Sequence, residues 1–125
     1  MSSISLKPEL NELYRLNEHI SNIIKKKNNH VDLIVEEIFA NIVNYSNATF
    51  ITVNANFEKQ ILTLEFIDDG FEFNPLKKEN FKAPDTIEDA KIGGIGISLI
   101  KELADTLEYQ YFNNKNHLKI IKKVE

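Results

Sequence analysis

Residues 91–100 read Lys91-Ile92-Gly93-Gly94-Ile95-Gly96-Ile97-Ser98-Leu99-Ile100, with three glycines in four positions leading into an amphipathic run. Glycine lets the backbone approach a ligand closely, and the free N–H groups at the start of a following helix favour an anion. A glycine-rich turn before a helix is also the ordinary chemistry of a tight turn. Two interpretations, a phosphate site and a plain turn, therefore stay open until the upstream residues are considered.

Upstream lies the pattern Glu37-x-x-x-Asn41, in a segment whose apolar residues recur at helical spacing. Residues four apart lie on one face of a helix, and this pair flanks the apolar arc, where a cleft would open. A carboxylate and an amide oxygen so placed can share one Mg²⁺-nucleotide, the amide as ligand and the carboxylate as base. A solvated helix flank would carry the same residue types.

A second pattern, Asp68-x-Gly70, follows an apolar stretch that is typical of a strand. Asp-Gly is common in hairpin turns, but the next residues reach Pro75 without starting an alternating partner strand, so a hairpin fits poorly. A carboxylate at a strand end can instead accept a hydrogen bond from an exocyclic amine, and glycine leaves room for the ring.

The composition limits the class of protein. The chain has 125 residues, no cysteine and a formal net charge of -4. We expect one domain over residues 1–125, with neither a disulfide framework nor a thiolate metal site. An acidic chain with scattered lysines disfavours nucleic acid and anionic membranes as partners, and no segment resembles a signal peptide or a membrane span. The expected location is the cytoplasm.

Hydrophobic periodicity predicts the order β-α-α-β-β-loop-α-β-β. The strands are expected at 3–7, 50–57, 61–67, 108–112 and 117–124, and the first two helices at about 9–26 and 31–45. The residues that mark a third helix after the glycines are Ile97, Leu99, Ile100, Leu103, Ala104 and Leu107. This order predicts an α+β fold, a two-layer sandwich with a largely antiparallel mixed sheet and helices on one face.

Taken together, the three elements resemble the GHKL, or Bergerat-fold, ATPase superfamily, most closely the small bacterial anti-sigma factors that are also serine-protein kinases. The resemblance extends over almost the whole chain. It is carried by Val35-Glu36-Glu37-Ile38-Phe39-Ala40-Asn41, Asp68-Asp69-Gly70-Phe71-Glu72-Phe73-Asn74-Pro75, Gly93-Gly94-Ile95-Gly96-Ile97-Ser98-Leu99-Ile100-Lys101 and the tail Asn116-His117-Leu118-Lys119-Ile120-Ile121-Lys122-Lys123.

The resemblance implies a role for each motif residue. Asp68 would read the adenine amino group and Gly70 would line the base pocket, with Phe73 in the same motif. Asn41 would bind Mg²⁺ and Glu37 would be the general base. Residues from about 76 to 92 would form the ATP lid, and the implied phosphate side comprises Lys91, Gly93, Gly94, Gly96, Ile97 and Lys101.

The implied function is an ATP-dependent serine/threonine kinase that also sequesters a sigma factor. It would phosphorylate a small anti-anti-sigma partner of the STAS type, with ATP, ADP and Mg²⁺ as ligands and a homodimer as its assembly. Two alternatives stay open: a nucleotide-gated protein-binding module without transfer, and a stand-alone histidine kinase catalytic domain. Asn44 and Tyr45 stand where many relatives carry a basic or histidine residue, and Glu36 offers a second choice of base.

Overall fold

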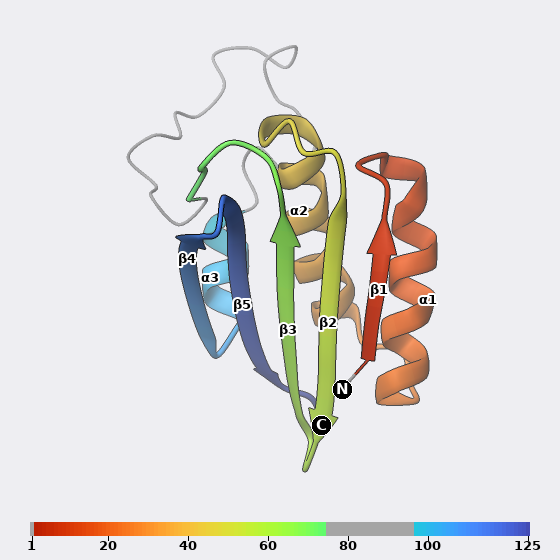
Figure 1. Cartoon of the computed structure of the whole chain (residues 1–125). Helices are drawn as coiled ribbons and strands as arrows, with labels where there is room; N and C mark the ends of the chain where they lie inside the picture. The colour runs from red at the N-terminus through yellow and green to blue at the C-terminus, as the bar shows by residue number, and fades with distance from the viewer. Residues whose placement is uncertain (1, 75–96) are drawn as a thin grey trace, which may run out of the picture.

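One antiparallel sheet of five strands organises the chain, in the order β1-β2-β3-β5-β4 (Figure 1). The computed structural model describes residues 2–74 and 97–125. The strands are β1 (Ser2–Leu6), β2 (Ile51–Glu58), β3 (Ile61–Asp68), β4 (Thr106–Phe112) and β5 (Lys115–Lys123). Each of the four pairings between neighbours in this order is antiparallel, so no parallel pair occurs among the described strands.

The helices lie on one side of this sheet, with α2 behind β2 and β3 and α3 behind β4 and β5 in the view of Figure 1. They are the short 3₁₀ helix η1 (Leu10–Glu12), α1 (Leu13–Ile24), α2 (Asn29–Tyr45) and α3 (Ile97–Leu103). The start of α2 is fixed by Asn28, whose side-chain oxygen accepts from the Val31 N–H at 3.0 Å. An asparagine cap of this kind satisfies an otherwise unpaired donor of the first turn.

The core lies between the helices and the inward face of the sheet. Alternate residues of the central strands are buried, as expected when one sheet face is packed. The buried strand residues are Ile51, Val53, Ala55, Leu62, Leu64, Phe66, Leu118 and Ile120, and the helical ones include Leu16, Ile20, Ile34, Val35, Ile38, Phe39 and Ile100. The predicted α+β class, with helices against one face of an antiparallel sheet, is confirmed.

Several element boundaries differ from the prediction by a few residues, and the end of the third helix differs most clearly. The third helix ends at Leu103, and Leu107 lies in β4, opposite Ile120. The Asp105 N–H donates to the Ile121 carbonyl at 2.9 Å, so the chain has already joined the sheet ladder there. Leu107 and Tyr109 alternate with polar residues along the strand. An apolar pattern this short fits both the 3.6-residue period of a helix and the two-residue period of a strand.

The register of the sheet brings two distant segments together at one end. Asp68, the last residue of β3, lies opposite Asn116, the second residue of β5. The last turns of α2 lie against the same end of the sheet. In the described part of the chain, no helix is both long and apolar enough to cross a membrane.

Candidate functional site

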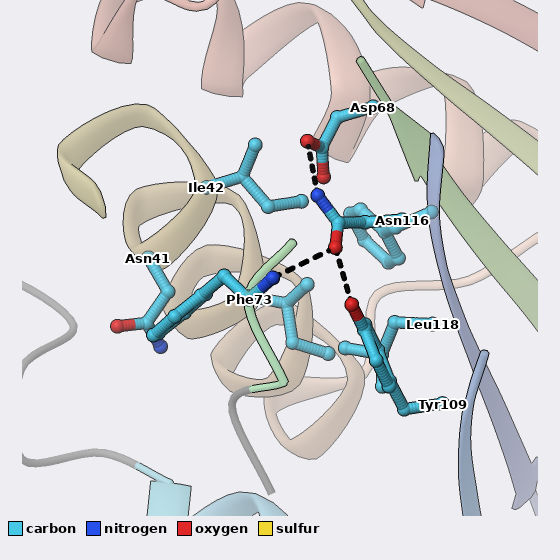
Figure 2. Close-up of a pocket in the computed structure, with 9 residues that line it drawn as sticks. Asn41, Ile42, Asp68, Phe73, Tyr109, Asn116 and Leu118 are labelled. Atoms are coloured by element: carbon cyan, nitrogen blue, oxygen red, sulfur yellow. Dashed lines mark hydrogen bonds between the residues drawn. The ribbon is translucent and has the colours of Figure 1, made fainter. Parts of the chain in front are cut away.

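A small pocket opens between α2 and the end of β3 that carries Asp68 (Figure 2). Its volume is about 20 Å³, which is room for roughly one water molecule. Its lining comprises Ile38, Asn41, Ile42, Phe66, Asp68, Phe73, Tyr109, Asn116 and Leu118. The structure thus brings together three of the residues assigned from the sequence, Asn41, Asp68 and Phe73. A nucleotide base would require this pocket to widen, since ligand pockets commonly measure about 300 Å³ or more.

Asp68 is the charged group of the pocket, and only 3% of its surface is exposed. Its Oδ1 accepts from the Gly70 N–H at 2.9 Å and from the Asn116 Nδ2 at 3.0 Å. Burial raises the pKa of Asp68, while hydrogen bonds from Asn116, Gly70 and Ser46 act in the opposite direction. The result is an oriented acceptor whose second oxygen, Oδ2, receives neither of the Gly70 and Asn116 bonds.

The neighbouring aspartate points elsewhere. Asp69 accepts from the Thr49 N–H at 2.7 Å and from the Phe50 N–H at 3.2 Å, and the Thr49 hydroxyl donates to it as well. These bonds tie the loop before β2 to the end of β3. The two adjacent carboxylates therefore have separate roles, because consecutive residues at a strand end face opposite sides.

The position of Gly70 has no room for a side chain. A Cβ atom built there would lie 2.1 Å from the Ser46 carbonyl oxygen and 2.7 Å from its carbonyl carbon. The Phe71 N–H donates to the same oxygen at 2.7 Å. Gly70 therefore lets the chain after β3 pass close to the end of α2. It is absent from the pocket lining, so its predicted contact with the base stays a prediction.

Gly70→Ala is expected to destabilise the fold by about 1 to 3 kcal/mol, because the new methyl group meets backbone that cannot rotate away. Denaturant unfolding of the variant measures this loss. Phe71→Ala is the matched control, since the Phe71 side chain is 65% exposed. Equal unfolding midpoints for Gly70→Ala and the wild type would contradict the close packing.

Glu37 and Asn41 lie one turn apart on α2, as the spacing predicts. Asn41 is 2% exposed, yet among the described residues neither its Oδ1 nor its Nδ2 has a hydrogen-bond partner. The Oε2 of Glu37 is also buried without a partner in this part of the chain. Buried polar atoms are nearly always paired, so an unpaired group at a pocket indicates a place for a ligand.

The electrostatics around Glu37 suit a proton acceptor. Burial raises the pKa of Glu37, and the charge of Glu36 raises it further. A raised pKa makes a carboxylate a stronger base near neutral pH. Glu37 is not among the residues that line the pocket, so its carboxylate lies beside this pocket rather than in its wall.

Several predicted residues cannot be placed. Lys91, Gly93, Gly94 and Gly96, together with the region assigned to the lid, lie outside the described residues. Ile97 is the first residue of α3, and Lys101 is exposed in its last turn. The structure therefore describes the residues assigned to the nucleotide base but not the glycines assigned to the phosphates, and both assignments stay predictions.

Two pocket residues were not assigned to the site from the sequence. Tyr109 lies in the strand predicted at 108–112, and Asn116 opens the tail that contributes to the family resemblance. Both line the pocket, and the Tyr109 hydroxyl donates to Asn116 Oδ1. One feature of the sequence sets Asn116 apart: it is polar, yet it lies on the same buried face of β5 as Leu118 and Ile120.

Comparison with known proteins agrees with the fold of this chain. The fold is similar to that of the histidine kinase AdeS from Acinetobacter baumannii, with a TM-score of 0.59, 13% identity, and coverage of 100% of this chain and 68% of that chain. It is also similar to the nucleotide-free catalytic domain of the histidine kinase ThkA, with a TM-score of 0.56, 12% identity and 99% of each chain covered. Comparison with curated proteins finds no match. The model of the histidine kinase-like ATPase domain matches residues 9–122, and the chain therefore belongs to this family.

Proposed function

We propose that the protein is an ATP-binding regulator that transfers the γ-phosphate of ATP to a serine or threonine of a partner protein. The observation that carries the proposal is the buried amide of Asn41, at the wall of the pocket that also holds Asp68, for which residues 2–74 and 97–125 offer no hydrogen-bond partner. The family supplies the nucleotide, since its domain is an ATPase domain. A single domain over residues 1–125 is part of this proposal.

Asp68 supports recognition of the base. Its Oδ1 is held by the Gly70 N–H and the Asn116 amide, and Ser46 also donates to the carboxylate. Each carboxylate oxygen has two lone pairs, so Oδ2 would accept from an exocyclic amine beside these bonds. Hydrogen bonds to charged groups contribute roughly 1.5 to 3 kcal/mol, which is enough to prefer adenine over a base with a carbonyl at that position.

Mg²⁺ fits the donors that α2 presents. Magnesium takes hard oxygen ligands and usually binds through one or two protein groups together with substrate phosphates. Among the described residues, no group of three or more histidine, cysteine, aspartate or glutamate side chains could form a cage made by protein alone. Asn41 would hold the ion with the nucleotide, and the ion would neutralise phosphate charge.

Glu37 is proposed as the base of the transfer. Its carboxylate would accept the proton of the attacking hydroxyl as that oxygen bonds to the γ-phosphorus and ADP leaves. Two observations support this role: Oε2 is buried with no hydrogen-bond partner in the described parts of the chain, and the pKa of Glu37 is raised. Glu36 is exposed on the same helix and is the weaker candidate.

The partners belong to the proposal as well. A sigma factor and a small anti-anti-sigma protein of the STAS type are proposed on the motif resemblance alone, as are the homodimer and the cytoplasmic location. Transfer of labelled phosphate from ATP to such a purified partner tests the kinase reaction, and calorimetry with ATP tests binding separately.

Asn41→Ala is expected to weaken Mg-ATP binding by about tenfold or more, because it removes a ligand of the bound ion. Binding measured without Mg²⁺ should change much less, since the base contacts stay intact. Asn22→Ala, at an exposed position of α1, is the matched control. If magnesium dependence were the same in Asn41→Ala and the wild type, Asn41 would not be the ligand.

A second candidate function is a nucleotide-gated binding module without transfer. The aromatic ring of Tyr45 lies 6.1 Å from that of Phe73, so this position serves packing where many relatives carry a basic or histidine residue. ATP binding by a protein that modifies no cognate partner would favour this second function.

A further inference from the structure

Asn116 uses its whole hydrogen-bonding capacity inside the protein. Its Nδ2 donates to Asp68 Oδ1 at 3.0 Å and to the Phe71 carbonyl at 2.7 Å. Its Oδ1 accepts from the Phe73 N–H at 3.0 Å and from the Tyr109 hydroxyl. An asparagine amide has two donor hydrogens and two acceptor lone pairs, so all four are occupied.

The orientation of this amide is fixed by its partners. A backbone N–H only donates and a backbone carbonyl only accepts, so the contacts with Phe73 and Phe71 exclude the flipped amide. Asn116 is 4% exposed, so solvent does not compete for these bonds. Figure 2 shows the amide between Asp68 on one side and Phe73 and Tyr109 on the other.

We propose that Asn116 is a positioning residue of the nucleotide site: it aims Asp68 at the base and ties residues 71–73 to the pocket, without contacting the base itself. This inference rests on the proposed nucleotide binding and names a determinant of base selectivity within that site. The two halves of the amide have separate tasks, because its donors serve Asp68 and Phe71 while its acceptor serves Phe73 and Tyr109.

The surroundings of Asp68 make this donor important. Among the described residues, the charged or titratable groups that interact with it are Asp69, the next residue of the chain, and Tyr109 from β4, and neither supplies a positive charge. Asp68 therefore depends on neutral donors to hold an ionised carboxylate in one orientation, and Asn116 is the side-chain donor from β5.

Asn116→Asp separates the two tasks. It preserves the shape and the acceptor for Phe73, but it places an oxygen where the donor to Asp68 stood. Asn116→Ala removes both tasks. The matched control is Asn114→Asp in the exposed β4–β5 turn, which adds the same charge on the same hairpin.

The experiment combines amide hydrogen exchange of the nucleotide-free protein with calorimetry of ATP and GTP. In Asn116→Ala the Phe73 amide should exchange about tenfold faster, because its acceptor is lost. The Phe71 amide is the internal reference for folding, since it donates to the Ser46 carbonyl instead. In Asn116→Asp the Phe73 amide should stay protected, while ATP affinity falls about 10- to 100-fold and GTP affinity changes little.

The outcomes are distinct. Equal losses of ATP and GTP affinity in Asn116→Asp, with Phe71 still protected, would show a merely structural residue and overturn the aiming of Asp68. If the exchange rate of the Phe73 amide were the same in Asn116→Ala and the wild type, Asn116 would not hold residues 71–73 at the pocket. A wild type that binds neither nucleotide would overturn both the proposed function and the role of Asn116 in orienting Asp68 toward a base. The hydrogen-exchange data would still show whether Asn116 holds residues 71–73 at the pocket. If Asn116→Asp does not fold, Asn116→Ala carries both readouts.

Discussion

Glu37→Gln is expected to lower phosphoryl transfer by about 10² to 10⁴, the usual cost of losing a general base. Most of the Mg-ATP affinity should persist, because the glutamine has the same shape and the lost interaction belongs to the transition state. Initial rates of transfer from labelled ATP to a serine or threonine of a purified partner, beside binding titrations, measure both quantities.

Glu36→Gln is the control, since it changes the adjacent exposed carboxylate. Normal transfer by Glu37→Gln would show that the base is misassigned and would make Glu36 the next candidate. If the wild type binds ATP and transfers nothing to any cognate partner, the kinase function is wrong and the nucleotide-gated module takes its place.

The pH dependence of wild-type transfer offers a further check on this base. Transfer needs the deprotonated form of Glu37, so the rate should rise with pH as this group ionises. Because burial and Glu36 raise the pKa of Glu37, the acid limb of the profile should lie above that of an ordinary glutamate. Glu36→Gln removes one of the two causes and should move the limb to lower pH.

Asp68→Asn is expected to lower the affinity for both ATP and ADP by about 10- to 100-fold, since a hydrogen bond to a charged group contributes about 1.5 to 3 kcal/mol. The variant can keep Oδ1 as the acceptor for Gly70 and Asn116, and it then presents a donor to the amine of the base. The number of phosphates should not matter, because Asp68 acts on the base.

Asp69→Asn is the matched control for this variant. The same chemical change then falls on the adjacent residue, whose carboxylate faces Thr49 and Phe50 instead of the pocket. Calorimetry of ATP, ADP and GTP with both variants gives the comparison. Equal ATP and GTP affinity in the wild type would end the assignment of Asp68 to the base.

Sequence patterns predicted where Glu37, Asn41 and Asp68 lie in the fold. Helical spacing placed Glu37 and Asn41 on one face of α2, and the end of an apolar strand placed Asp68 at one end of the sheet. Both inferences use local periodicity, which a single chain segment reveals. The boundary between α3 and β4 was harder to predict, because Leu107 fits the apolar spacing of a helix as well as that of a strand. Its pairing with Ile120 shows that it belongs to the strand.

The supporting residues could not be found in the same way. The pairing of β3 with β5 places Asn116 next to Asp68. Position 70 requires glycine, because any side chain there would collide with Ser46. These contacts depend on how distant segments meet, which local spacing does not encode. The positions of the motif residues in the fold were therefore easier to predict than the residues that contact them.

The bond between Asp68 and Asn116 joins residues 48 positions apart in the chain. Because strands β3 and β5 are hydrogen-bonded neighbours, their pairing sets the geometry of this bond whatever the length of chain that connects them. Doubling the length of a connecting loop costs only about 0.6 kcal/mol of closure entropy. An insertion between residues 74 and 97, where the sequence predicts a loop, would leave β3, α3, β4 and β5 intact, so we expect only a small change in folding free energy. Evolution or design could vary the length of that segment while keeping the bond between Asp68 and Asn116.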